Sequence, residues 1–393
     1  MIGPQELLVP GEPNVERIND VEFCGKMARP DAEFKLPRSR ASTANETLII
    51  QPTYEPSELD PLDKYEIFWM EHQKWLEEKG YMLRPRYRPG WVPSWENGKD
   101  DEKQDKRDEA EDRSVFSQTA DIMDATRISD NALVSMKRME NGLENEIAVY
   151  FSTEPLASHP HNHCVPIYEV LQIPDSDLDN EVIIVMPLLR PFDEPRFKDC
   201  TQLNIMMDPR PTFPAMFHPG DISRSRDFKS KAKFHTRTSR PTKYLFIDFG
   251  LSLRFEPGQD RKVFPIRGGD RTVPEFEWYG MKTKFDPFPV DVYYLGNLIR
   301  EEFLQKTRGL EFIIPLVSDM VQDDPAKRPT MDEVVSRYDR MINTLSSLRL
   351  RSRLVERHEG PWFLFPTFRT VAHIYRTTIH VFTFRSPIPR PKS

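Results

Sequence analysis

The chain has 393 residues, of which 38% are hydrophobic and 30% charged, with 36 prolines against 16 glycines. This composition excludes a wholly disordered protein, allows one large or two ordinary domains, and predicts long irregular segments between the folded parts. The three cysteines have a spacing that fits neither a disulfide framework nor a zinc site, which favours a reducing compartment. No apolar stretch approaches the roughly 20 residues that span a bilayer. We therefore expect a soluble intracellular protein, cytoplasmic or nuclear, without a membrane partner.

The net charge of -7 conceals two basic segments. Residues 209–243 and residues 348–393 each carry nine Lys or Arg against two acidic residues, which gives +7 apiece and leaves -21 for the remainder. Such segments can meet phosphate, RNA or acidic protein, although solvated loops and a solvated tail are the plainer alternative.

The first hundred residues predict one helix between irregular segments. Residues 1–60 are rich in proline and turn formers, and we expect a poorly ordered arm. Residues 61–79 place large aromatic side chains at helical spacing, which predicts an amphipathic helix. Residues 81–95 alternate aromatics with Arg and Pro, which predicts an extended segment. The mixed charges of residues 99–113 complete a region, 61–113, that we expect to be a helix and a linker preceding the folded core.

From about residue 114 the pattern changes to short strands, and after residue 286 it changes to helices. Strands are expected within 120–128, 132–139, 165–173 and 181–187. Later apolar residues recur at helical spacing, first Val292, Leu295, Ile299 and Phe303, then Phe312, Leu316 and Met320. The last helix opens with Thr330 and Glu333 at the spacing of a capping box. Strands followed by helices indicate an α+β fold in two lobes.

Several short motifs follow one another in this region. The strand pattern 132–139 contains V-S-M-K ending at Lys137, and a short helical segment with Glu146 comes next. The spacing D-x-x-x-x-N occurs at Asp199 and Asn204, and a strand then runs into D-F-G at Asp248. Further on are V-P-E at Val273, Pro274 and Glu275, and a late arginine, Arg328.

In this order the motifs resemble the protein kinase signature set, over roughly residues 114–345. The sequence also resembles expanded kinase-like families of mushroom-forming fungi, in which a long insert separates the catalytic loop from D-F-G. The resemblance implies a β-rich small lobe over 114–189, a helical large lobe over 190–345 that includes the basic insert 209–243, and a basic tail over 346–393.

The resemblance also implies ATP and Mg²⁺ as cofactors. Lys137 would contact the phosphates and form an ion pair with Glu146, while small Ser135 would leave room for the adenine ring. Met186 and Leu188 would lie beside the adenine at the hinge.

The three remaining site residues belong to the large lobe of the resemblance. Asp199 would accept or orient the proton of the substrate hydroxyl, and Asn204 and Asp248 would bind magnesium. Glu275 and Arg328 would form a buried pair.

The sequence departs from the kinase pattern at three places. The positions expected for the phosphate-loop glycines hold Val115, Ser117 and Ala120. H-R-D is replaced by Phe197, Lys198 and Asp199. Met186 precedes Asp199 by only 13 positions, which leaves no room for the two helices that kinases place there. The chain is therefore either an incomplete gene product, which the abrupt join favours, or a degraded relative in which other segments, such as the apolar tail 362–384, cover the gap.

The leading hypothesis is an ATP-dependent protein kinase that transfers phosphate to a Ser or Thr hydroxyl of a protein substrate. The basic insert would favour acidic substrates. The alternative is a pseudokinase that binds partners without catalysis. An RNA-binding function is the weakest hypothesis because no aromatic-rich strand motif accompanies the basic segments.

Overall fold

The computed structural model describes residues 62–97, 110, 121–174, 181–192, 205–256, 258–264, 270–278, 283–357 and 364–391, and the strand at 23–24. The chain divides into two compact units. Residues 32–248 and 388–393 form one, here called the sheet unit, and residues 1–31 and 249–387 form the other, the helical unit. The division therefore falls after Asp248 and not after residue 189, where the resemblance set the boundary between lobes.

The sheet unit is built around a five-stranded antiparallel sheet with strand order β2-β3-β4-β6-β5. The strands are β2 (Tyr81–Met82), β3 (Ile122–Arg127), β4 (Leu133–Glu140), β6 (Glu181–Pro187) and β5 (Glu169–Gln172). Four of them lie where the sequence predicted strands. The fifth, β2, was expected to be part of an irregular segment, and it pairs with β3 at the edge of the sheet.

The helices of this unit are short. They are α1 (Lys64–Glu71), α2 (Gln73–Glu78) and α4 (Leu143–Phe151), with 3-10 turns η2 (Pro85–Tyr87) and η3 (Ser94–Asn97). Asp63 and Glu66 form a capping box at the start of α1. Gly80, at φ 92°, ends the helical pair in the left-handed region that glycine adopts without strain.

One face of the sheet packs against α1 and α2. Met136 of β4 and its cross-strand partner Val185 of β6 lie in one buried cluster with Trp69 and Leu76 of the two helices. The prediction that residues 61–113 precede the folded core is therefore wrong for 62–97, because these residues supply a strand and a large part of that core. Residues 99–109 and 111–113 of the expected linker lie outside the described residues.

A buried ionic network fixes the loop after β2 to α1. Arg86 donates from Nε to Oε1 of Glu66 at 2.9 Å and from Nη2 to Oε2 at 3.0 Å. The hydroxyl of Tyr87 donates to Glu66 at 3.0 Å. Burial raises the pKa of Glu66, but the contacts with Arg86 and the Asp63 amide together lower it by more than burial raises it. The net pKa therefore lies below the ordinary value. The expected extended segment is thus an anchored loop.

A second, three-stranded sheet joins β7 (Arg190–Pro191), β8 (Ile205–Met207) and β9 (Tyr244–Phe246) in that order. The basic insert 209–243 folds back on it, and its Phe213 and Phe217 lie fully buried with Met207. The guanidinium of Arg190 lies 4.4 Å and 4.7 Å from the centroids of these two phenylalanine rings. The insert is therefore part of the sheet unit and not of a helical lobe.

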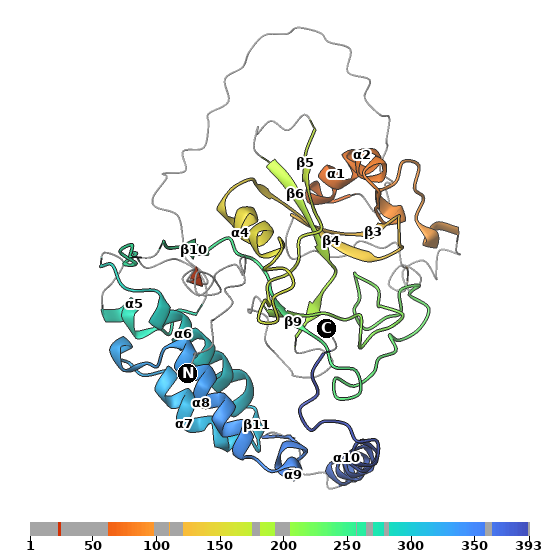
Figure 1. Ribbon diagram of the computed structural model, residues 1–393. Coiled ribbons are helices and arrows are strands. Elements are labelled where there is room, and N and C mark those ends of the chain that lie inside the picture. Colours follow the sequence, from red (N-terminus) through yellow and green to blue (C-terminus); the bar gives the residue numbers. More distant parts are fainter. Residues whose placement is uncertain are drawn as a thin grey trace, which may run out of the picture. The chain divides into compact units, whose positions relative to one another are not determined.

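The helical unit contains the helices predicted after residue 286 together with others that the sequence did not predict (Figure 1). Its described helical elements are α5 (Pro274–Trp278), α6 (Phe288–Leu298), the π-helical turn η6 (Ile299–Leu304), η7 (Glu311–Ile313), α7 (Ile314–Met320), η8 (Pro325–Lys327), α8 (Met331–Thr344), α9 (Ser347–Leu350) and α10 (Leu364–Phe382). The predicted helices correspond to α6 with η6, η7 with α7, and α8. Two small antiparallel pairs join β1 (Phe23–Cys24) to β10 (Leu253–Arg254) and β11 (Thr307–Arg308) to β12 (Val355–Glu356). The predicted capping box of Thr330 and Glu333 is confirmed at the start of α8.

The core of this unit follows from the predicted periodicity. Val292 of α6 and Leu316 and Met320 of α7 are buried in one cluster. Gly296 lets α6 and α7 approach closely, since a Cβ atom there would lie 2.7 Å from the Cβ of Met320. The two units together make a mixed fold of antiparallel sheets and helices, compatible with the predicted α+β class. No helix in the described ranges is long and apolar enough to cross a membrane.

Candidate functional site

Lys137 lies at the centre of the candidate site, on β4 in the sheet unit. It pairs across the sheet with Ile122 and Ile184, and strand alternation places its side chain on the face opposite the Met136 cluster. Its Nζ lies 2.5 Å from Oε1 of Glu144 and 3.1 Å from Oδ1 of Asp248. Burial lowers the pKa of Lys137, but Glu144 and Asp248 together raise it by more than burial lowers it. The net pKa is above the ordinary value, so the ammonium is held charged.

The carboxylate that pairs with Lys137 is Glu144 and not Glu146, which corrects the sequence prediction. Helix α4 begins at Leu143, and its first turn presents Glu144 to the lysine while Glu146 is exposed. A helix turns by about 100° per residue, so side chains two positions apart point to nearly opposite sides. The spacing of Glu144 from buried Ile147 and Ala148, three and four residues on, is the signal that identifies the inward carboxylate.

Asp248 is positioned by the strand that precedes it. β9 pairs with β8 on one side, and on the other the amide of Phe246 donates to the carbonyl of His163 at 2.7 Å while the amide of Val165 donates to the carbonyl of Phe246 at 2.9 Å. Asp248 itself has φ 63°, a left-handed conformation that non-glycine residues adopt rarely. Its side chain is 50% exposed. The turn thus presents a carboxylate at the strand's end.

Two of the predicted adenine-contacting residues lie side by side. Ser135 and Met186 are directly paired across β4 and β6, on the same face as Lys137, and both are half-buried. Leu188 is placed differently. Its backbone amide bonds to the carbonyl of Leu133 at 3.3 Å, but its side chain packs against the buried cluster that the basic insert forms.

Asp199 and Asn204 lie outside the described residues, as do Val115, Ser117 and Ala120. The register of the strand that follows Asn204 is nevertheless described, and it relates this part of the sequence to Asp248. Ile205, which directly follows Asn204 in the sequence, pairs with Phe246, two residues before Asp248. The sequence patterns predict neither β7 and β8 nor the pairing of β8 with β9.

In the helical unit, the predicted pair of Glu275 and Arg328 is confirmed. Nη1 and Nη2 of Arg328 donate to Oε1 and Oε2 of Glu275, each at 2.7 Å. Both side chains are at most 1% exposed. Arg328 also donates to the carbonyls of Gln322 and Pro289, so the buried guanidinium has several partners.

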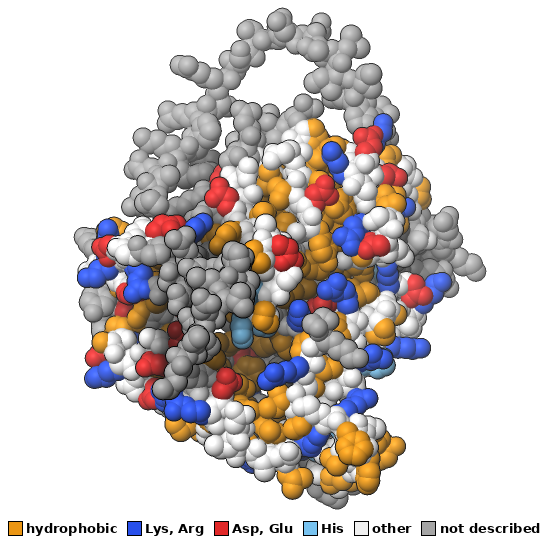
Figure 2. Space-filling view, viewed as in Figure 1, with side chains coloured by type: hydrophobic (Ala, Val, Ile, Leu, Met, Phe, Trp, Pro, Cys, Tyr) orange, Lys and Arg blue, Asp and Glu red, His pale blue; other side chains and the backbone are white. Residues whose placement is uncertain are grey.

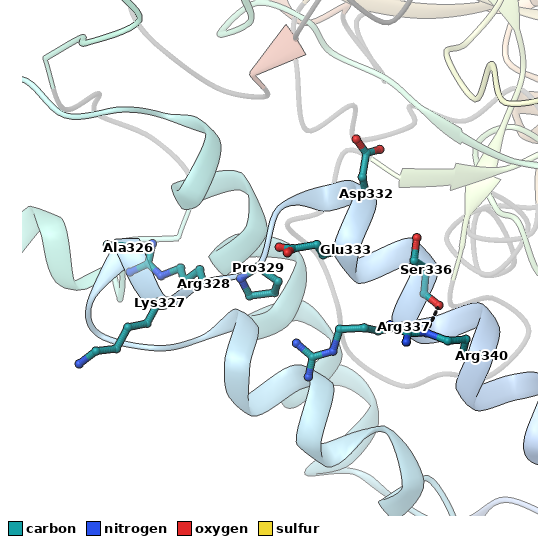
Figure 3. A pocket seen from close by; sticks show the side chains of 9 residues that line it. All are labelled: Ala326, Lys327, Arg328, Pro329, Asp332, Glu333, Ser336, Arg337 and Arg340. Carbon is teal, nitrogen blue, oxygen red and sulfur yellow. Dashed lines mark hydrogen bonds between the residues drawn. The ribbon is translucent and has the colours of Figure 1, made fainter.

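A shallow hollow of about 540 Å³ opens beside this pair and the start of α8 (Figure 3). It is lined by Ala326, Lys327, Arg328, Pro329, Asp332, Glu333, Ser336, Arg337 and Arg340. Most of its charges already have partners, since Arg337 pairs with Asp319 at 2.5 Å and Glu333 accepts from the amide of Thr330 at 2.8 Å. The hollow therefore belongs to the framework of the unit.

The donor set around Lys137 fits a magnesium-bound phosphate group. An ammonium binds phosphate oxygens, and a half-exposed carboxylate binds a hard cation. Within the described ranges no group of three or more His, Cys, Asp or Glu could hold a metal by protein ligands alone. A cation here would thus depend on water and phosphate oxygens, as magnesium commonly does.

No model of a known protein family matches the chain, and a search of curated proteins likewise found no match.

Proposed function

We propose that the chain is an ATP-dependent, protein-kinase-like phosphotransferase that uses Mg-ATP and a hydroxyl of a protein substrate, Ser or Thr by default. The observation that carries the proposal is the position of Lys137 between Glu144 and Asp248, at 2.5 Å and 3.1 Å. Lys137 of a strand and Glu144 of the helix that follows it meet there the end of a strand more than a hundred residues further along the chain, at Asp248. The two-lobed kinase-like fold is part of the same proposal.

The roles of these residues follow from their charge and exposure. Glu144 holds the ammonium of Lys137 in place, so that it faces the phosphate oxygens of the nucleotide. Asp248, exposed on one side, offers its carboxylate to the cation. Ser135 and Met186 line the adjoining part of the sheet face, where a small hydroxyl beside a thioether leaves space for a flat ring. When bound, Mg-ATP supplies the phosphoryl group and the charge that organises its transfer.

The residues that would act on the substrate are Asp199, as acceptor of the hydroxyl proton, and Asn204, through its amide oxygen on the cation. Supporting this assignment, β8 starts one residue after Asn204 and lies beside the end of β9, close in sequence to Asp248. The left-handed backbone of Asp248 adds support, because rarely populated backbone conformations of non-glycine residues cluster at functional sites.

The proposal is tested by phosphate transfer from labelled ATP to a mixture of proteins, with Asp199→Asn and Asp248→Asn as variants. We expect transfer by the natural chain, and a loss of at least about a hundredfold in each variant. Glu146→Gln is a matched control and should keep full transfer. Transfer that persists in both Asn variants would show a contaminating kinase and contradict the proposal.

A pseudokinase that binds nucleotide or a partner without transfer is the second candidate. One observation favours it. Residues 192–204 alone join β7 to β8, and these two strands pair directly, so the connection leaves no room for the helices that kinases place there. Binding of Mg-ATP without any transfer would support this candidate and contradict the enzyme.

A further inference from the structure

Helix α10, Leu364–Phe382, exposes a continuous apolar face. Phe368, Val371, Tyr375, Ile379 and Phe382 follow one another at spacings of three, four, four and three, which places them on one side of the helix. Their exposed fractions are 75%, 60%, 68%, 40% and 77%. Figure 2 shows hydrophobic side chains gathered over α10. A helix of a water-soluble fold normally buries such a face.

The chain contacts the other side of this helix, which is polar. His373 and Thr377 are half-buried, and Nε2 of His373 lies 2.9 Å from the carbonyl oxygen of Arg351. Arg351 also donates to the carbonyl of Arg385, just beyond the helix. Within the described ranges, the hydrophobic core clusters contain no residue of α10. The helix is therefore fixed by its polar side with its apolar side turned outward, so the idea that this tail fills a gap in the core finds no support.

The surroundings of the apolar face are positively charged. Between residues 364 and 391 the chain has four arginines and no aspartate or glutamate. Arg369 and Arg376, seven residues apart, lie along one flank of the apolar face. Burial lowers the pKa of His380, and Arg385, Arg351 and Arg376 lower it further, as expected where positive charges gather.

These features discriminate among the surfaces that can cover the helix. A second copy of the chain would bring its own basic flank, Arg369 and Arg376, to the same interface, because a two-fold interface places identical patches together. The repulsion disfavours that arrangement. An anionic lipid surface suits both properties at once, since acyl chains accept the apolar face and headgroup phosphates accept the arginines.

We propose that α10 is an interfacial helix that binds the surface of an anionic phospholipid bilayer. Phe368, Tyr375 and Phe382 enter the boundary between headgroups and acyl chains, and Arg369 and Arg376 contact lipid phosphates. The helix lies along the bilayer surface, in agreement with the finding that no described helix could span it. The proposal is independent of phosphate transfer, and it replaces the expectation that the protein has no membrane partner.

Co-sedimentation of the full chain with vesicles tests this proposal. We expect binding to vesicles of equimolar phosphatidylcholine and phosphatidylserine, weaker binding to phosphatidylcholine alone, and release at high salt. Phe368→Ser with Tyr375→Ser should weaken binding at least about tenfold. Val92→Ser with Val335→Ser removes two comparably exposed apolar side chains elsewhere and should change nothing. Arg369→Gln with Arg376→Gln should abolish the preference for phosphatidylserine.

Two results would overturn the proposal. One is a natural chain that stays in the supernatant with every vesicle, while its thermal unfolding shows that it is folded. The other is a lipid-free dimer in size-exclusion chromatography that Phe368→Ser with Tyr375→Ser converts to a monomer, because the apolar face would then be covered by a second copy.

Discussion

The two units each contain an ionic cluster, and the clusters differ in exposure. In the helical unit, Glu275 and Arg328 are at most 1% exposed and satisfy each other with two parallel hydrogen bonds. In the sheet unit, Lys137 meets two carboxylates in a setting where Asp248 is 50% exposed. One pair is closed to solvent, and the other cluster is open on one side.

The difference in exposure distinguishes an ion pair that stabilises the fold from a cluster that can bind a ligand. A buried bidentate pair cannot exchange its partners without exposing an uncompensated charge, so it fixes helix α5 to the segment before α8. An open cluster can exchange one partner for a ligand, because part of it stays accessible to solvent. We therefore expect substitutions in the first to act on stability and substitutions in the second to act on binding.

The largest effect is expected from Arg328→Met, which leaves Glu275 buried without its partner. The free energy of unfolding should fall by about 3–5 kcal/mol, measured by urea denaturation. The double variant Glu275→Leu with Arg328→Met should recover most of this loss, since an apolar pair of similar volume can replace a buried ion pair. A double variant as unstable as the single one would contradict the assignment of the loss to the unpaired charge.

The next effect concerns the lysine's partner. Glu144→Gln removes the carboxylate that holds Lys137, and Mg-ATP affinity measured by calorimetry should fall about tenfold, or about 1.4 kcal/mol. Glu146→Gln changes an exposed carboxylate of the same helix and should leave the affinity unchanged. A loss of affinity in Glu146→Gln but not in Glu144→Gln would favour the predicted pairing of Lys137 with Glu146 and contradict the geometry of α4.

The smallest effect is the loss of stability that we expect from Lys137→Met. Because its cluster is partly exposed, the loss at neutral pH should be about 1 kcal/mol or less. The folded-state pKa of Lys137 lies above 10.5, so its contribution is fully present below pH 10.5 and disappears as the pH rises through the folded value. As the pH rises, the free energy of unfolding of the natural chain should therefore approach that of the variant. A difference between the two free energies that grows with pH would contradict the raised pKa of Lys137.

The sequence predicted the elements whose signal is local. Short strand-like stretches predicted β3, β4, β5 and β6, and the capping pair Thr330 and Glu333 marked the start of α8. The pairing of Glu275 with Arg328, 53 positions apart, was predicted from the resemblance and not from periodicity.

The misses have physical causes. Strand β2 has only two residues, too few to show alternation, and its place in the sheet depends on pairing with β3. Glu144 and Glu146 both carry carboxylates near the start of α4, so only the rotation of the helix decides which one reaches Lys137. The insert 209–243 looked like a solvated loop because its charge conceals Phe213 and Phe217, which are buried against β8.

The central claim is that Lys137 and Asp248 share a nucleotide, and titration calorimetry with Mg-ATP tests it most directly. We predict saturable binding by the natural chain, loss of that binding in Lys137→Met, and no change in Lys327→Met, which alters an exposed lysine of the helical unit. Equal affinity in the natural chain and Lys137→Met, with both proteins folded, would contradict the claim.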